Sequence, residues 1–129
     1  MNLRNLTEAS MERLKDFKNA HGETIHTEPN GSDWSLTDWF TALTGEVDEV
    51  GGIIKKIRRG DVTLEEAYFD LADELADVFC YLVILAERSG INLEYATVRK
   101  FNEVSRYIGS EIRVSTFYVR DGEILRRKP

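Results

Sequence analysis

The sequence is poor in cysteine and has no long apolar run. Its one cysteine, Cys80, cannot form a disulfide within the chain, which favours a reducing compartment. The longest apolar run, residues 78–86, is far shorter than the ~20 residues that a membrane-spanning helix needs. The start of the chain is polar and periodic, without the apolar segment of a signal peptide. These absences predict a cytoplasmic protein.

Positive charge is also in short supply, since 17 basic residues face 23 acidic ones and the formal net charge is −6. An acidic chain of this kind is not expected to bind nucleic acid or an anionic membrane. A ligand that carries phosphates stays open, because bound cations can reverse the local field. The length and the 42 % hydrophobic content predict one globular domain over residues 1–129.

Proline occurs only at positions 29 and 129, so little in the chain forbids helix. Apolar residues at helical spacing, together with capping signals, predict four helices and an all-α, four-helix bundle-type fold. The expected helices cover residues 3–20, 35–59, 63–88 and 92–108, with a loop over residues 21–34. Residues 113–127 are rich in β-branched and aromatic side chains, and they are expected to form either a short β-hairpin that turns at Asp121-Gly122 or an irregular tail.

Three carboxylates crowd the segment GEVDEV in the middle of the second expected helix. At about 100° per residue, Glu46 falls inside the apolar stripe that contains Trp39. Glu49 lies one turn further along, at the edge of that stripe, whereas Asp48 falls among positions that face solvent. Two of the three carboxylates are therefore expected to point inward.

The third expected helix repeats this pattern in the segment DLADELADVFCYLVIL. Glu74 shares its face with Val78 and Leu85, and Asp77 lies on the flank of the same face. If the two helices pack side by side, their inward pairs form one cluster of four carboxylates. Its members are Glu46, Glu49, Glu74 and Asp77.

Such a cluster needs compensation, because burying even one unpaired carboxylate costs several kcal/mol. Oxygen-only ligation by carboxylates and water favours a hard divalent cation, which is magnesium, manganese or calcium. The competing interpretation is that the acids pair with Arg or Lys or lie in water at the rim of the bundle. Histidine occurs only at His21 and His26, in the early loop, so the Glu-x-x-His pairs of di-iron bundles are missing. Cys80 is interpreted as a packed thiol.

These motifs resemble those of the MazG-like, all-α nucleoside triphosphate pyrophosphohydrolases. The family signature is E-x-x-E on one helix and E-x-x-D on the next, and the resemblance covers residues 36–106. It also includes the apolar run after Asp77 and an Asn on the following helix, in KFNEVSRY. The resemblance implies Mg²⁺-dependent hydrolysis of a nucleoside triphosphate to the monophosphate and pyrophosphate, with the four carboxylates as metal ligands. It further implies a homodimer or homotetramer.

The resemblance also implies roles for single residues. Glu46 or Glu49 would activate the attacking water, with the choice between them left open. Substrate contacts are expected from a set of basic, amide and aromatic side chains, namely Lys56, Tyr81, Lys100, Asn102 and Arg106. Trp34 and His21 are candidates for closing over a base, whereas Trp39 lies so centrally on the apolar stripe that core packing is expected for it.

The sequence departs from the family pattern in the early loop and at Asp48, where the family commonly has Gly, and more importantly at a pair of glycines. Gly51 and Gly52 stand inside the second expected helix, where each glycine costs about 1 kcal/mol relative to alanine. They could permit close approach of another backbone or mark a kink, and a non-catalytic member of the family stays open. Two other functions remain as alternatives: a non-enzymatic helical module that binds a metal or a partner, and a phosphoribosyl-ATP pyrophosphohydrolase.

Overall fold

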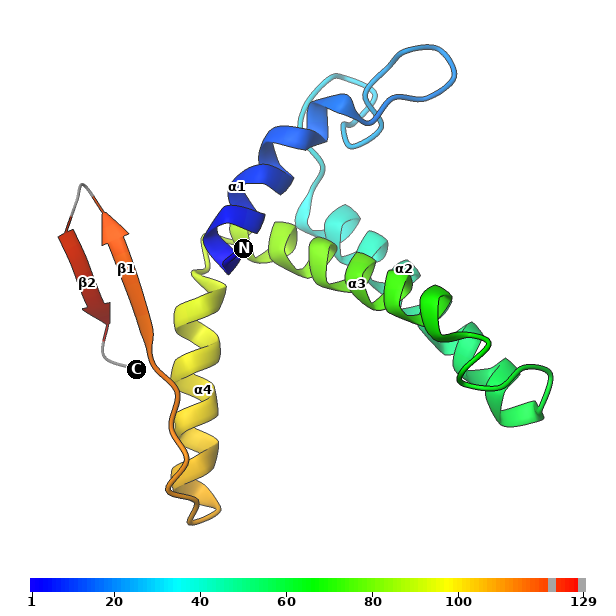
Figure 1. Ribbon diagram of the computed structural model, residues 1–129. Helices are drawn as coiled ribbons and strands as arrows, with labels where there is room; N and C mark the ends of the chain where they lie inside the picture. The colour runs from blue at the N-terminus through cyan, green and yellow to red at the C-terminus, as the bar shows by residue number, and fades with distance from the viewer. Residues whose placement is uncertain (121–122, 128–129) are drawn as a thin grey trace. The chain divides into compact units, whose positions relative to one another are not determined.

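The computed structural model describes the backbone of residues 1–120 and 123–127 and the side chains of residues 1–115. The chain divides into two compact units, residues 1–89 and residues 90–129. The first unit holds α1 (Leu3–Arg13), a short 3-10 helix η1 (Leu14–Asp16), α2 (Leu36–Arg59) and α3 (Tyr68–Arg88) (Figure 1). The second holds α4 (Leu93–Tyr107) and the strands β1 (Thr116–Arg120) and β2 (Glu123–Arg127). The four predicted helices are present, and the described part of the chain is mainly α-helical.

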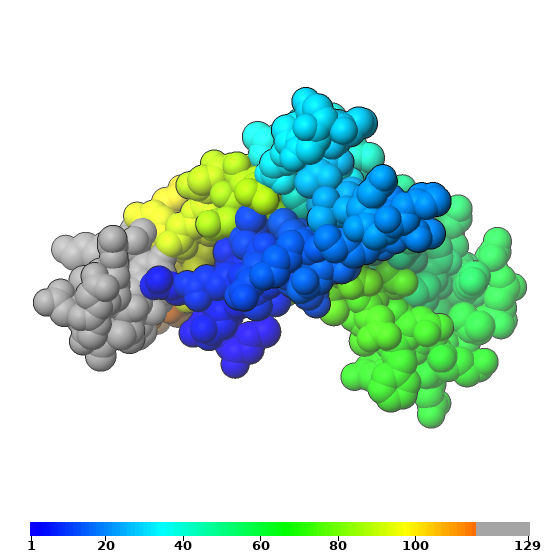
Figure 2. All heavy atoms as spheres, turned by 90° about the horizontal axis from the view of Figure 1, so that it is seen from above, coloured from blue at the N-terminus to red at the C-terminus, as the bar shows by residue number. Residues whose placement is uncertain are grey.

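In the first unit, α2 and α3 lie side by side as a helical hairpin, and α1 packs on α3 (Figure 1). Seen from above, α1 and the loop that follows it cover the face of this unit nearest the viewer (Figure 2). The core is small and centres on Leu14, Trp39 and Ile84, with partly buried apolar side chains around them. Trp39 is completely buried, so its predicted role in core packing is confirmed.

The ends of α2 follow the sequence signals. Ser35 and Asp38 form a reciprocal capping box, in which the Asp38 N–H donates to the Ser35 hydroxyl and the Ser35 N–H donates to the Asp38 carboxylate. Gly60 ends the helix at φ 80°, the left-handed conformation that glycine adopts without a Cβ clash. The helix runs without interruption through Gly51 and Gly52, and a Cβ at either position would meet nothing within 4 Å inside this chain. The expected kink or close backbone approach is therefore not found among the described residues.

Two predicted helix boundaries were wrong. The first helix ends at Arg13 rather than near residue 20, because the Asn19 side chain accepts the N–H groups of His21 and Glu23 and holds a local turn instead. The third helix begins at Tyr68 and not at residue 63, where the bonds among the described residues include only one half of the predicted capping box. There the Glu66 N–H donates to the Thr63 hydroxyl at 3.1 Å, and the residues between are turns.

In the second unit, the Asn92 side chain caps α4 by accepting the Tyr95 N–H, as predicted. Strands β1 and β2 pair antiparallel, with Thr116 opposite Arg127 and Arg120 opposite Glu123. The hairpin alternative is thus the one that the structure has, and its predicted turn residues, 121–122, lie outside the described residues. Among the described residues, no helix combines the length and the apolar character that a membrane crossing requires.

Candidate metal centre and adjoining pocket

Three of the four predicted carboxylates meet between α2 and α3. Glu46 of α2 and Glu74 and Asp77 of α3 each offer one oxygen, and these oxygens all lie within 4.8 Å of one another. Helical geometry accounts for the meeting, because Glu74 and Asp77 are one turn apart on α3 and Glu46 lies on the α2 stripe that faces this helix. Glu49, the fourth predicted member, lies at the exposed edge and interacts electrostatically with both glutamates.

The surroundings of the cluster raise the pKa values of Glu46 and Glu74. A hydrogen bond with Glu49 is the largest cause that raises the pKa of Glu74 to about 7, followed by burial and by repulsion from Glu49, Asp77 and Glu46. Burial is the largest cause of the raised pKa of Glu46, and repulsion from Glu49 and Asp77 adds to it. A hydrogen bond between two carboxyl groups needs a shared proton. With a pKa of about 7 in the absence of a cation, Glu74 is still partly protonated at neutral pH, where an isolated carboxylate is ionised.

Basic residues do not neutralise the cluster. None of the ion pairs found among residues 1–115 includes any of the four acids. One carboxylate oxygen of Glu46 and one of Glu74, both Oε2, are buried without a hydrogen-bond partner among the described residues. Pairing with Arg or Lys, the competing interpretation of the sequence, is thus not what the structure shows for these side chains. An all-oxygen set with two unsatisfied buried oxygens fits a hard divalent cation.

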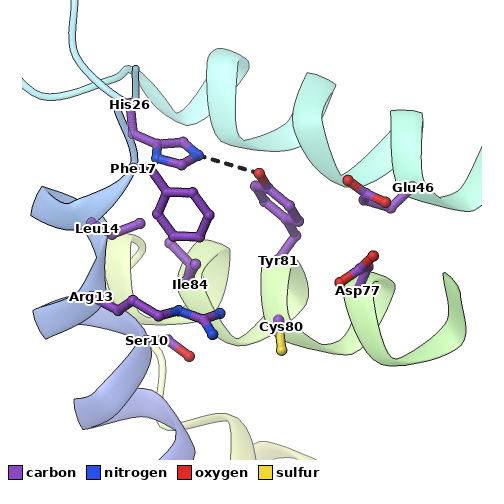
Figure 3. A pocket seen from close by; sticks show the side chains of 10 residues that line it. All are labelled: Ser10, Arg13, Leu14, Phe17, His26, Glu46, Asp77, Cys80, Tyr81 and Ile84. Carbon is purple, nitrogen blue, oxygen red and sulfur yellow. Dashed lines mark hydrogen bonds between the residues drawn. The ribbon is translucent and has the colours of Figure 1, made fainter. Parts of the chain in front are cut away.

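A pocket of about 220 Å³ adjoins the carboxylates within the same unit (Figure 3). Glu46 and Asp77 lie at one end of it, and Tyr81 and Ile84 continue along α3. The remaining walls come from α1, the segment that follows it and the early loop. The lining residues are Ser10, Arg13, Leu14, Phe17, His26, Glu46, Asp77, Cys80, Tyr81 and Ile84.

His26 connects this pocket to the aromatic core. Its Nε2 lies 3.2 Å from the Tyr81 hydroxyl, and its ring stacks on Trp39 at a centroid distance of 5.4 Å. Edge contacts of 4.9 Å to Phe17 and to Trp34 complete its surroundings. Burial lowers the pKa of His26 against the opposing effect of the Asp33 charge, so the ring favours the neutral form.

Sequence reasoning did not identify Ser10, Arg13 and His26 as pocket residues. A signal was available for the first two, because Ser10, Arg13, Leu14 and Phe17 follow the i, i+3, i+4, i+7 spacing of one helical face. For His26 no local pattern exists, since it reaches the pocket only through the path of the loop. Of the loop residues that were proposed to close over a base, Trp34 packs against His26 and Trp39, whereas His21 is exposed.

The residues predicted to contact a substrate are divided between the two units. Tyr81 lines the pocket and Lys56 is exposed on α2, both in the first unit. Lys100, Asn102 and Arg106 belong to α4 in the second unit. Lys100 forms an ion pair of 3.1 Å with Glu103 on its own helix.

Asn102 has a role in the structure that the sequence did not indicate. Its side-chain amide donates to the Val114 carbonyl and accepts the Val114 N–H, both at 2.9 Å. The residue is only 2 % exposed, so both halves of its amide are committed to holding the segment after α4. The geometry of this unit therefore gives no support to the predicted contact between Asn102 and a nucleotide.

Comparison with known proteins gives no match: no family model, no curated protein and no solved structure matches the chain.

Proposed function

We propose that this chain is a Mg²⁺-dependent nucleoside triphosphate pyrophosphohydrolase of the MazG-like type, which cleaves an NTP or dNTP between the α and β phosphates. The products are the monophosphate and pyrophosphate, and sanitation of the nucleotide pool is the expected purpose. The observation that carries the proposal is the meeting of Glu46, Glu74 and Asp77 within 4.8 Å, without a basic partner among the described residues.

The chemistry of such a site is mainly charge neutralisation and positioning. Magnesium, or manganese in its place, would be held by Glu46, Glu74 and Asp77, with Glu49 at the edge of the same site. When bound, the metal neutralises phosphate charge and polarises the phosphoryl group. In the reaction, the oxygen of a water molecule joins phosphorus while the anhydride bond breaks, and the protons of the water are released.

Glu46 and Glu49 are the proposed groups that orient this water or accept its proton. A buried carboxylate with an unsatisfied oxygen, as in Glu46, can hold a water molecule by a charge-assisted hydrogen bond. Glu49 is exposed at the edge of the cluster, where a proton taken from the water can leave to solvent. Lys56, Lys100 and Arg106 remain proposed contacts for phosphates that the metal leaves uncovered.

We also propose that the protein assembles as a homodimer or homotetramer. Several large apolar side chains are at least half exposed on the outer faces of α2 and α3, among them Phe40, Val47, Ile54, Phe69 and Leu75. An exposed apolar surface of this kind is typical of an association site.

The deciding experiment measures pyrophosphate, monophosphate and orthophosphate separately, with each common NTP and dNTP, in Mg²⁺ and in EDTA. We expect Mg²⁺-dependent release of pyrophosphate in equal amount to the monophosphate. Glu74→Gln should abolish it, whereas Asp73→Asn, which removes an exposed acid next to Glu74 on α3 but outside the cluster, should retain it.

The alternatives give different results in the same assay. Activity only on phosphoribosyl-ATP would replace the proposed substrate class with that of histidine biosynthesis. The non-enzymatic module would be favoured instead if the protein is folded and binds metal but hydrolyses none of the substrates, and if the Glu46→Gln variant behaves like the original protein.

A further inference from the structure

The pocket beside the carboxylates is too small for a whole nucleotide. Its volume is about 220 Å³, whereas sites that enclose a complete small-molecule ligand measure about 300–1,000 Å³. Because it shares Glu46 and Asp77 with the cluster, a group in the pocket lies next to anything bound at the carboxylates (Figure 3). If phosphates bind at the cluster, as the proposed function requires, the pocket is placed to hold the ring of the same molecule.

The walls of the pocket are suited to a flat ring. Three of its ten lining residues are aromatic, and His26 contacts both of the others, Phe17 and Tyr81. Leu14 and Ile84 add apolar surface. Aromatic rings bind a planar heterocycle by offset stacking and by edge contacts. The chemistry of the walls therefore favours a nucleobase over a sugar or an alkyl chain.

Two of the lining residues each carry a buried polar atom without a hydrogen-bond partner in the part of the chain that the structure describes. The Ser10 hydroxyl belongs to a residue that is 3 % exposed, and His26 Nδ1 to one that is 4 % exposed. A serine inside a helix commonly bonds to the carbonyl four residues earlier, yet Ser10 has no hydrogen-bond partner among the described residues. Buried polar groups are rarely left unsatisfied, so two such atoms in one pocket point to a ligand with a polar edge.

Arg13 adds a cation to this pocket. Its guanidinium lies over the Phe17 ring at 5.4 Å from the centroid, and Figure 3 shows it directed toward α3 at Cys80. No ion pair of Arg13 is found among residues 1–115. A guanidinium has donors only, in a fork that matches two neighbouring acceptors. Its partner on a base must therefore be an edge that presents acceptors.

We propose that Ser10 and Arg13 of α1 are specificity-determining residues that select a keto-bearing base, guanine above all, in this pocket; the inference rests on the proposed function. Guanine presents O6 and N7 side by side as acceptors, the pair to which an arginine binds in bidentate fashion. Adenine presents N7 beside an amino group, whose donors face those of Arg13. His26 Nδ1 supplies a further polar contact, and its tautomer follows from the direction of its hydrogen bond to Tyr81.

The test compares kcat/KM for dGTP and dATP, which share their sugar and triphosphate. We expect the unaltered protein to prefer dGTP at least about tenfold, as a bidentate arginine contact provides. Arg13→Gln should remove this preference by lowering kcat/KM for dGTP alone, and Ser10→Ala should reduce it. Lys15→Gln, which removes a nearby exposed cation outside the pocket, should keep the preference. Equal use of the two substrates, or an unchanged preference in Arg13→Gln, would overturn the inference while leaving the proposed function intact.

A binding measurement separates this inference from the proposed function. Titration calorimetry of deoxyguanosine and deoxyadenosine in EDTA needs no hydrolysis and no metal, and it places no phosphate beside the carboxylates that line the pocket. Selective binding of deoxyguanosine that Arg13→Gln abolishes would support the pocket even if no pyrophosphate is ever released. Failure of both nucleosides to bind, together with an absence of base preference, would overturn the inference. Ser10→Ala should raise the urea midpoint of the free protein, because it removes a buried hydroxyl that has no hydrogen-bond partner among the described residues; a large loss of stability would assign Ser10 to folding instead.

Discussion

The imidazole of His26 and the hydroxyl of Tyr81 are joined by a hydrogen bond of 3.2 Å, and this bond ties the early loop to α3 one turn beyond Asp77. It connects the aromatic core to the side of the carboxylate cluster. Tyr81 is also close enough to the acids for Glu46 and Asp77 to help raise its pKa, after burial as the largest cause. The loop and the candidate metal centre are thus parts of one arrangement within the first unit.

Tyr81→Phe is expected to destabilise the protein by about 1–3 kcal/mol, because it leaves His26 Nε2 buried without its partner. Urea unfolding at neutral pH measures the change. Tyr107→Phe, at the end of α4, gives a tyrosine control outside the first unit, because Tyr107 is 91 % exposed. A Tyr81→Phe variant as stable as the original would show that the bond contributes nothing net to folding.

Mg²⁺ is expected to raise the melting temperature. A ligand that binds only the folded state at 100 times its Kd stabilises it by about 2.7 kcal/mol. Glu46→Gln and Glu74→Gln should lose this response, since each removes a ligand oxygen of the cluster. Asp48→Asn, an exposed acid of the same segment outside the cluster, should retain it. An equal thermal shift in all four proteins would place the metal elsewhere.

In metal-free protein, the free energy of unfolding is expected to fall as the pH rises from about 4.5 to about 7. Over this range the unfolded chain releases the proton of Glu74, whose ordinary pKa is 4.5, while the folded protein, with a pKa of about 7, retains it. The stabilisation from this group is therefore complete at acid pH and lost as the pH passes the folded pKa.

Urea midpoints of the original protein and of Glu74→Gln, measured in EDTA at a series of pH values, test this sign. The variant should show a smaller decline with pH, because it has no proton to release at this position. The lowered pKa of His26 acts in the opposite direction, with stability lost as the pH falls below the unfolded value of 6.5. That contribution is common to both proteins and cancels in their difference. A steeper decline in the variant would contradict the prediction.

Gly52→Ala is expected to stabilise the protein by about 1 kcal/mol, since the position is exposed in a continuous helix and a Cβ there meets nothing within 4 Å. Gly60→Ala is the matched control, for which the opposite effect on stability is expected. At φ 80° an added Cβ is strained, so this change should destabilise. Thermal or urea unfolding of the two variants measures both signs. A destabilising Gly52→Ala would indicate that another surface, such as a second copy of the chain, approaches this glycine.

Val47→Glu is expected to weaken self-association. Phe40, Val47 and Ile54 repeat every seven residues, so they lie on one face of α2, and all three are at least half exposed. A charge in the middle of this stripe would be costly to bury in an interface. Light scattering should give a dimer or tetramer for the original protein and a lower mass for the variant. A mass of 14.8 kDa for the original protein at micromolar concentration would overturn the assembly proposal.

Much of the fold could be predicted from local chemistry. The long second helix was placed nearly to the residue, because its capping box and its glycine end act within a few positions of the boundary. The inward direction of Glu46 and Glu74 followed from helical periodicity alone. The first helix was predicted to extend too far, since the Asn19 side chain accepts backbone N–H groups and forms a local turn. Hydrophobic periodicity does not detect such a turn.

The sequence by itself determined the four helices, their apolar stripes and the two acidic pairs, since all of these depend on residues within a few turns of one another. Only the tertiary structure decided that Glu46 meets Glu74 and Asp77, while Glu49 stays at the exposed edge, and that no basic side chain among the described residues neutralises them. It also decided that His26 and α1 line the same pocket, and that the Asn102 side chain forms hydrogen bonds with the Val114 backbone. These relationships join residues 12 to 74 positions apart, and such contacts depend on how helices and loops pack, which a local pattern does not specify.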